Sequence, residues 1–342
     1  MAINKYVMET SPLGPSRKVK AAIRKAVKDI NTLPGDGQTR LERLFLSKYG
    51  AGNKSILFAN SLKELLFLIC RRLHPKRILI VGPTLNIYQE AAQASGAVIE
   101  SISGREQNVF SPDLQELIEK AEGCDLVFIA NPNRISGKVL SETVLKQVLE
   151  ALSMKDCVTV IDESLIEFAG DEGFIRIAAN SSNIIILRTT ASYFGLPGLE
   201  LACAVAAPKV IEFLRPGLHS DPSILAVEAA RTAFKDKSYR KLSDQFMKEE
   251  KRLLRKAISR MPGMVMYESD TNILLLKAAH LAPEIARRAD QAGLAVELCS
   301  DIDGLNDQFL RISVMKHDHN LKFIKLLNGI SLEKAEKKSS TA

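Results

Sequence analysis

The residues best placed to do chemistry stand at the ends of three apolar, strand-like runs. Asn131 follows one run, Asp162 and Glu163 end a second, and Arg188 with Thr189 ends a third. In open sheets of parallel strands flanked by helices, ligands bind at the carboxyl ends of the strands. We therefore expect a ligand site along this edge of the predicted sheet.

Signatures of several other chemistries are absent from the chain. It contains no GxGxxG, GxxxxGK[ST], HExxH or GxSxG motif. The five cysteines are scattered and form no CxxC pair, which favours buried structural thiols. His317, Asp318 and His319 have ligand-like spacing, but they lie in a polar segment that we expect at the surface. We predict no metal site.

The elements that must position the strand-end residues alternate along the first two thirds of the chain. Buried strands that alternate with helices of 10–15 residues are typical of a mostly parallel sheet with helices on both faces. The acidic loop between Asp162 and Asn183 is expected to be exposed. Predicted strands are 55–59, 77–81, 98–101, 126–130, 158–162, 183–188 and 201–206; predicted helices are 61–73, 85–95, 112–121 and 141–152.

The pattern changes near Ser220, where two helices precede an α+β arrangement of short strands and helices. A chain of 342 residues fits two domains. The predicted division is an N-terminal arm and helix at 1–35, a large α/β domain at 36–220, a small α+β domain at 221–332 and a disordered tail at 333–342. The tail is predicted because it has no apolar positions.

The charge and hydropathy of the chain indicate which classes of partner it can bind. The net charge is +7 and the pI is near 9.1. Much of the charge lies in the tail and on the helix at 235–260, where a solvated face is favoured over nucleic-acid binding. No apolar run is long enough to span a membrane, and the N-terminus lacks an apolar signal segment. We expect a cytoplasmic protein with no membrane or nucleic-acid partner.

Seven segments carry motifs in the order known from one group of enzymes. The chain resembles the fold-type-I pyridoxal-phosphate (PLP) aminotransferases, with the strongest likeness to threonine-phosphate decarboxylase and histidinol-phosphate aminotransferase. The resemblance implies an α/β fold of the PLP-transferase type, with a large mostly parallel-sheet domain, a smaller α+β C-terminal domain and a dimer. The segments are 12–16, 58–64, 83–88, 131–137, 162–165, 186–200 and 304–314.

Aligned on these motifs, the position of the Schiff-base lysine holds Ser192, and that of the phosphate-binding arginine holds Glu200. A serine cannot form an imine with an aldehyde, and a glutamate repels a phosphate dianion. No lysine lies between Lys155 and Lys209. The resemblance therefore implies the fold of an aminotransferase without a catalytic lysine.

Most other positions of the implied cofactor pocket are also changed. The carboxylate for the pyridinium nitrogen is retained as Asp162, and the arginine for the substrate carboxylate is retained as Arg311. The remaining pocket positions are Asn60, Ser61 and Leu62 in the phosphate cup, Leu85 for the stacking aromatic residue, Asn131 at a strand end, Arg134 for the ring-hydroxyl asparagine and Leu165 for a tyrosine.

Three expectations concern charge balance in this pocket. Arg134 should fold into the ring pocket and pair with Asp162, because an unpaired buried carboxylate is costly. Lys63 either neutralises Glu200 or is a surface lysine. Arg311 either binds a ligand carboxylate or braces the small domain, and Glu297 stands where the family has a further arginine.

Two functions stay open. One is a non-catalytic scaffold, partner subunit or metabolite-binding homologue, as a homodimer or as a heterodimer with an active homologue. It would bind no cofactor, although a carboxylate or phosphate metabolite could use Arg311. The alternative is an aminotransferase or decarboxylase that uses PLP or pyridoxamine phosphate by lysine-independent chemistry on an amino acid or amino-acid phosphate.

Overall fold

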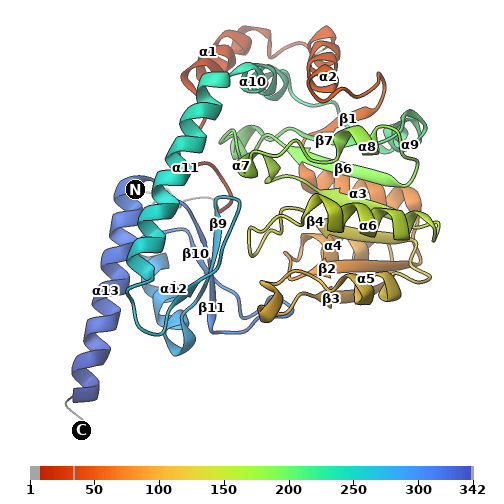
Figure 1. Cartoon of the computed structure of the whole chain (residues 1–342). Helices are drawn as coiled ribbons and strands as arrows, with labels where there is room; N and C mark the ends of the chain where they lie inside the picture. The colour runs from red at the N-terminus through yellow and green to blue at the C-terminus, as the bar shows by residue number, and fades with distance from the viewer. Residues whose placement is uncertain (1–7, 34, 340–342) are drawn as a thin grey trace.

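A seven-stranded sheet forms the larger part of the protein (Figure 1). The computed structural model describes residues 8–33 and 35–339. The strand order is β1-β7-β6-β5-β4-β2-β3; β7 is antiparallel to both neighbours and the other neighbouring pairs are parallel. The strands are β1 (Ile56–Ala59), β2 (Arg77–Gly82), β3 (Val98–Ser103), β4 (Leu126–Ala130), β5 (Val158–Asp162), β6 (Ile184–Thr189) and β7 (Ala202–Val205).

Helices cover both faces of this sheet, as predicted. Strands such as β4 are apolar at every position because side chains on both faces are buried. On one face lie α3 (Leu62–Leu73), α4 (Ile87–Ala94) and α9 (Pro208–Leu214). On the other lie α2 (Asp36–Tyr49), α5 (Leu114–Lys120), α6 (Glu142–Ser153), α8 (Ile175–Ala178) and α10 (Ile224–Lys235). The predicted fold class is confirmed.

A second, antiparallel sheet follows in the order β10-β11-β9-β8. Three helices share its apolar core. The strands are β8 (Val265–Met266), β9 (Ile273–Lys277), β10 (Val296–Leu298) and β11 (Phe309–Ser313), and the helices are α11 (Lys237–Ile258), α12 (Ala282–Gln291) and α13 (His317–Ser339). Each sheet has its own core, and the predicted domain boundary near residue 220 stays a prediction.

The prediction of a disordered tail is wrong for residues 333–339, because α13 continues to Ser339. Glu, Lys and Ala, which make up most of this stretch, have high intrinsic helix propensity. Residues 340–342 of the predicted tail lie outside the described residues.

The acidic loop after Asp162 is also not the exposed segment that we expected. It contains α7 (Ile166–Ala169) and α8, and Glu163 and Glu167 are buried. Both glutamates pair with the buried Arg188, which explains how an acidic segment can be packed inside the protein.

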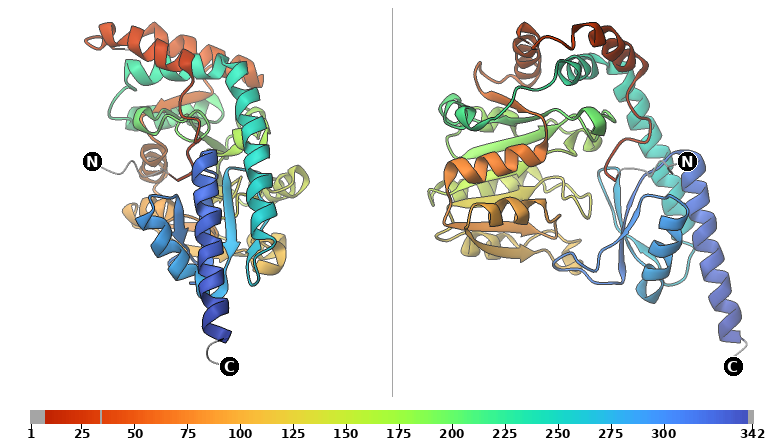
Figure 2. Two further views of the ribbon diagram at one scale, coloured as in Figure 1. Left: turned by 90° about the vertical axis from the view of Figure 1, so that its left-hand side faces the viewer. Right: turned by 180° about the vertical axis from the view of Figure 1, so that it is seen from behind.

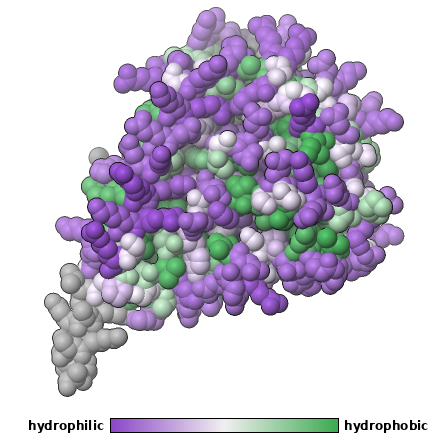
Figure 3. All heavy atoms as spheres, viewed as in Figure 1, coloured by the Kyte–Doolittle hydropathy of each residue, from purple (hydrophilic) through white to green (hydrophobic). Residues whose placement is uncertain are grey.

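The N-terminal arm, residues 8–14, links the two sheets. Met8 packs against the core of the small sheet, and the chain then runs to α1 (Arg17–Ala26), which lies beside α10 (Figure 2). Space-filling atoms show a mainly hydrophilic face with small, scattered hydrophobic patches (Figure 3). No helix among the described residues is long and apolar enough to cross a membrane.

Candidate functional site

The carboxyl ends of β2, β4, β5 and β6 meet at one edge of the large sheet, where the sequence predicts a ligand site. Asp162 ends β5, and the backbone N–H of Asn131, just after β4, donates to its carbonyl oxygen at 2.9 Å. Both residues are 1% exposed. The edge therefore holds a buried carboxylate that needs partners within the protein.

The carboxylate of Asp162 accepts three hydrogen bonds. Its donors are the Tyr88 hydroxyl at 2.5 Å, the Ser164 backbone N–H at 2.8 Å and Nη1 of Arg134 at 3.1 Å. The predicted pairing of Arg134 with Asp162 is confirmed. Burial and the charge of Asp162 raise the pKa of Tyr88 well above its ordinary value, so the tyrosine stays a proton donor.

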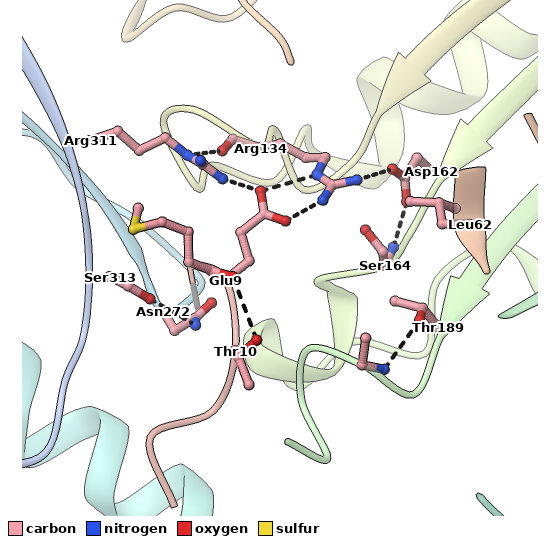
Figure 4. Close-up of polar contacts among 12 residues, drawn as sticks. Glu9, Thr10, Leu62, Arg134, Asp162, Ser164, Thr189, Asn272, Arg311 and Ser313 are labelled. Carbon is pink, nitrogen blue, oxygen red and sulfur yellow. Dashed lines mark hydrogen bonds and ion pairs between the residues drawn. The ribbon is translucent and has the colours of Figure 1, made fainter. Parts of the chain in front are cut away.

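The loop after β4 is folded so that the Arg134 side chain points toward Asp162 (Figure 4). The side-chain oxygen of Asn133 accepts from the backbone N–H groups of Ile135 and Ser136, both at 2.9 Å, and its amide donates to Pro83. Gly137 follows with a φ of +71°, a conformation that favours glycine. Arg134, between these anchors, is only 9% exposed.

Glu9 of the N-terminal arm is a second carboxylate partner of Arg134, and no motif in the sequence marks it as one. Nε of Arg134 donates to Glu9 at 3.1 Å, and Nη2 of Arg134 and Nη2 of Arg311 donate to its two carboxylate oxygens (Figure 4). Burial alone would raise the pKa of Glu9, but the two guanidinium groups outweigh it and lower the pKa below its ordinary value.

Arg311 on β11 is fully engaged by the protein. Its Nε donates to the backbone oxygen of Arg134 at 2.8 Å, Nη1 donates to Glu297 at 2.9 Å, and Nη2 donates to Glu9. The side chain is 3% exposed. Of the two roles expected for Arg311, these contacts favour the bracing of the small sheet against the large one.

The predicted phosphate cup lies at the N-terminus of α3, and carboxylates of the chain occupy it. Ser61 caps the helix by accepting from the backbone N–H of Glu64 at 3.1 Å. The carboxylate of Glu200 accepts from the Leu62 backbone N–H at 3.0 Å and from the Thr189 hydroxyl at 2.8 Å. Negative charge is favourable at this end of a helix, so Glu200 stabilises the cup without a cation.

The pairing of Lys63 with Glu200 is wrong. Nζ of Lys63 instead lies 2.7 Å from Glu90 on α4, and both side chains are about half exposed. Glu200 points inward to the helix N-terminus, whereas the Lys63 side chain leaves the helix on its solvent side. The surface-lysine reading is the correct one.

The remaining pocket positions are spread over different surroundings. Ser192 is 5% exposed, and its backbone oxygen accepts from the Ser11 N–H of the arm at 2.8 Å. Leu165 is fully buried, and the amide of Asn60 donates to Ser220 at 3.1 Å. Leu85 packs against the apolar cluster around Phe110, away from the large sheet's main core.

Arg188, Glu163 and Glu167 form a buried ion-pair network that stabilises the fold and takes no part in the site around Asp162. Nε of Arg188 donates to Glu163 and its Nη1 to Glu167, both at 2.9 Å, while Nη2 donates to the backbone oxygen of Glu172. Arg188 is 2% exposed. The strand-end pattern alone could not separate this buried ion-pair network from the site around Asp162.

A sequence comparison decides the family. The profile of "Aminotransferase class I and II" matches residues 1–327. The chain belongs to this aminotransferase family. Its resemblance, predicted from seven short segments, is thereby confirmed.

Among residues 8–33 and 35–339, no cluster of three or more His, Cys, Asp or Glu side chains could hold a metal ion.

Similar proteins in this family cover almost the whole chain. Histidinol-phosphate aminotransferase 2 of Archaeoglobus fulgidus is 29% identical, and the match covers 94% of this chain and 91% of that protein. A histidinol-phosphate aminotransferase structure from Sinorhizobium meliloti, in complex with pyridoxal-5'-phosphate, gives a TM-score of 0.85 at 19% identity and covers 95% and 90% of the two chains. The L-threonine-O-3-phosphate decarboxylase structure from Porphyromonas gingivalis gives a TM-score of 0.80 at 19% identity and covers 95% and 98%. The two structures show the fold.

Proposed function

We propose that this aminotransferase-family chain is non-catalytic and acts as a scaffold or partner subunit rather than as a PLP enzyme. The observation that carries the proposal is the buried contact of Arg134 with Asp162. Asp162 is the carboxylate that the family resemblance assigns to the cofactor's ring nitrogen. Here it already has a guanidinium partner 3.1 Å away, which neutralises it.

The ring pocket fits PLP poorly. A pyridinium nitrogen would have to replace Arg134 at Asp162, and Arg134 would then leave Glu9 as well. Removing one partner from a buried ion pair costs about 3–5 kcal/mol. The cofactor would have to offset that cost before it gained any binding free energy.

The phosphate cup fits PLP poorly for a different reason. The Leu62 N–H and the Thr189 hydroxyl, donors at the helix N-terminus, are already bonded to the carboxylate of Glu200. A phosphate dianion in the same place would meet this carboxylate as a like charge. The Glu200 carboxylate therefore occupies the position in which an anionic ligand would bind at this helix terminus.

The residue at the position of the Schiff-base lysine cannot form an imine. Ser192 has no amine, and it is held in a buried turn beneath the N-terminal arm. Lys63, the lysine beside the cup, is paired with Glu90 on the surface. We derive no catalytic step through PLP for this chain.

Our proposal includes a dimer, either of two copies or with an active homologue, in the cytoplasm and without nucleic acid. A carboxylate or phosphate metabolite remains a candidate ligand. The alternative is a decarboxylase or aminotransferase that acts on an amino acid or amino-acid phosphate without a lysine. It draws support from the retained Asp162 and from the named activities of the similar proteins.

An absorbance titration with PLP and with pyridoxamine phosphate tests the loss of cofactor binding. We expect no saturable spectral change in the wild type, and the same flat response in Asp162→Ala. Saturable binding that Asp162→Ala abolishes would show a working cofactor pocket and would favour the enzyme alternative. Light scattering after gel filtration, alone and after co-expression with an active homologue, distinguishes the homodimer from the heterodimer.

A further inference from the structure

The N-terminal arm reaches across the site and places Glu9 between two arginines from different sheets. Arg134 follows β4 of the large sheet, and Arg311 lies on β11 of the small sheet. Both guanidinium groups donate to the Glu9 carboxylate, which is 7% exposed (Figure 4). Glu9 is thus the shared counter-ion of two buried cations.

The arm is held in a conformation that its own backbone does not favour. Glu9 has a φ of +65°, in the left-handed region where residues other than glycine are strained. Two hydrogen bonds and apolar packing also secure this segment: the Ser11 N–H donates to the Ser192 oxygen at 2.8 Å, the Tyr239 hydroxyl donates to Ser11 at 3.0 Å, and Met8 and Leu13 pack against apolar clusters. Together with the ion pairs of Glu9, these contacts offset the strain.

Without the carboxylate, the site would be a strong anion acceptor. Arg134 and Arg311 would lose their shared partner while they remain adjacent, since Nε of Arg311 donates to the Arg134 backbone oxygen at 2.8 Å. Arg134 would keep Asp162 and Arg311 would keep the half-exposed Glu297, but three of their buried N–H groups would lose the acceptor that Glu9 provides. Buried donors without an acceptor are costly, and the two adjacent cations would share less negative charge. Their planar N–H donors match the two oxygens of a carboxylate.

We propose that Glu9 is a tethered ligand of this site, and that a small free carboxylate competes with the arm for Arg134 and Arg311. Binding of the free carboxylate then displaces Glu9, and residues 8–14 are released from the two arginines. The inference rests on the proposed function, because the arm can fill the pocket only where no cofactor occupies it.

The test is chemical rescue of Glu9→Gly by propionate. Glycine suits a φ of +65°, so the variant removes the carboxylate without adding backbone strain. We expect its melting temperature to fall by about 4–7 °C and to recover saturably as propionate is added. Propionamide and sodium chloride at matched concentrations should give no such recovery.

Asp156→Gly is the matched control. Asp156 is an exposed acidic residue with a φ of +52°, so this change also places glycine at a left-handed position but removes no buried counter-ion. Propionate should leave its melting temperature unchanged. Equal effects of propionate and propionamide on Glu9→Gly, or the same propionate effect on Asp156→Gly, would overturn the proposal.

Hydrogen exchange of the wild type provides a second readout if Glu9→Gly does not fold. High propionate should speed exchange in the peptide that contains the Ser11 amide, and propionamide should not; unchanged exchange would contradict arm release. These outcomes are independent of PLP. If the wild type binds no PLP and propionate does not rescue Glu9→Gly, only the inference about the arm is contradicted. If the wild type binds PLP, the proposed function itself is contradicted.

Discussion

Replacement of Arg134 by methionine should destabilise the protein strongly. The change removes the only guanidinium on Asp162 among the described contacts, and two of the three donors to Glu9. Asp162 would keep the Tyr88 hydroxyl and the Ser164 N–H, and Glu9 would keep Arg311. Methionine preserves much of the side-chain volume, so the loss reports on charge rather than on a cavity.

The magnitude follows from the burial of the pair. Arg134 and Asp162 have side chains that are 11% and 1% exposed, and breaking such a buried pair costs about 3–5 kcal/mol. With an unfolding entropy of about 2.1 cal/mol/K per residue, this loss corresponds to about 4–7 °C in melting temperature for a chain of 342 residues.

The loss of stability in Arg134→Met should shrink at low pH. In the wild type the pKa of Glu9 is lowered, so its stabilisation is fully present above the unfolded value of 4.5 and disappears as the pH falls through the folded value. In Arg134→Met the Glu9 carboxylate loses one of the two guanidinium groups that lower its pKa, so it takes up its proton at higher pH and contributes less stability to be lost on acidification. The gap between the two proteins should therefore narrow below about pH 5.

Thermal and urea unfolding at pH 7 and pH 4 measure this gap. Arg105→Met is the control, since Arg105 is exposed and lies outside the network, and it should change stability by less than about 0.5 kcal/mol. A loss below about 1 kcal/mol for Arg134→Met at pH 7, or a gap that does not depend on pH, would refute the ion-pair account.

Three further predictions follow from other parts of the structure. Glu200→Gln should cost about 0.5–2 kcal/mol in urea unfolding, because it removes the charged acceptor at the N-terminus of α3; no measurable loss would contradict the cap. Lys48, whose pKa desolvation lowers to about 8, should be acylated at pH 8 ahead of most other lysines, as peptide mass mapping can show. Ser192→Lys alone should fail to retain PLP through gel filtration, because Arg134 and Glu200 still occupy the pocket; retention by the single variant would show that these two residues do not block it.

The sequence predicts the large sheet well because each strand is a short apolar run followed by a helix. The pairing of Arg134 with Asp162 was also predictable, since a buried carboxylate needs a partner and the family resemblance puts both residues in one pocket. These predictions rest on local pattern and on charge balance between strand ends that a parallel sheet must bring together.

Contacts between distant segments could not be predicted in this way. Glu9 lies 125 residues from Arg134 and 302 residues from Arg311 along the chain, and nothing in the arm's sequence marks it as a counter-ion. Glu200 and Lys63 both border the phosphate cup, but their side chains point in different directions. Glu200 bonds to the Leu62 N–H, whereas Lys63 pairs with Glu90. Sequence proximity to a site does not fix side-chain direction.

The most direct test of the central claim is equilibrium dialysis of PLP against two proteins in parallel. These are the wild type and a triple variant, Arg134→Asn, Ser192→Lys and Glu200→Arg, which restores the residues that the family resemblance implies at three of the altered positions. We expect the triple variant to retain about one PLP per chain and the wild type to retain none above the free concentration. Retention by the wild type would contradict the claim that the chain's own side chains have replaced the cofactor.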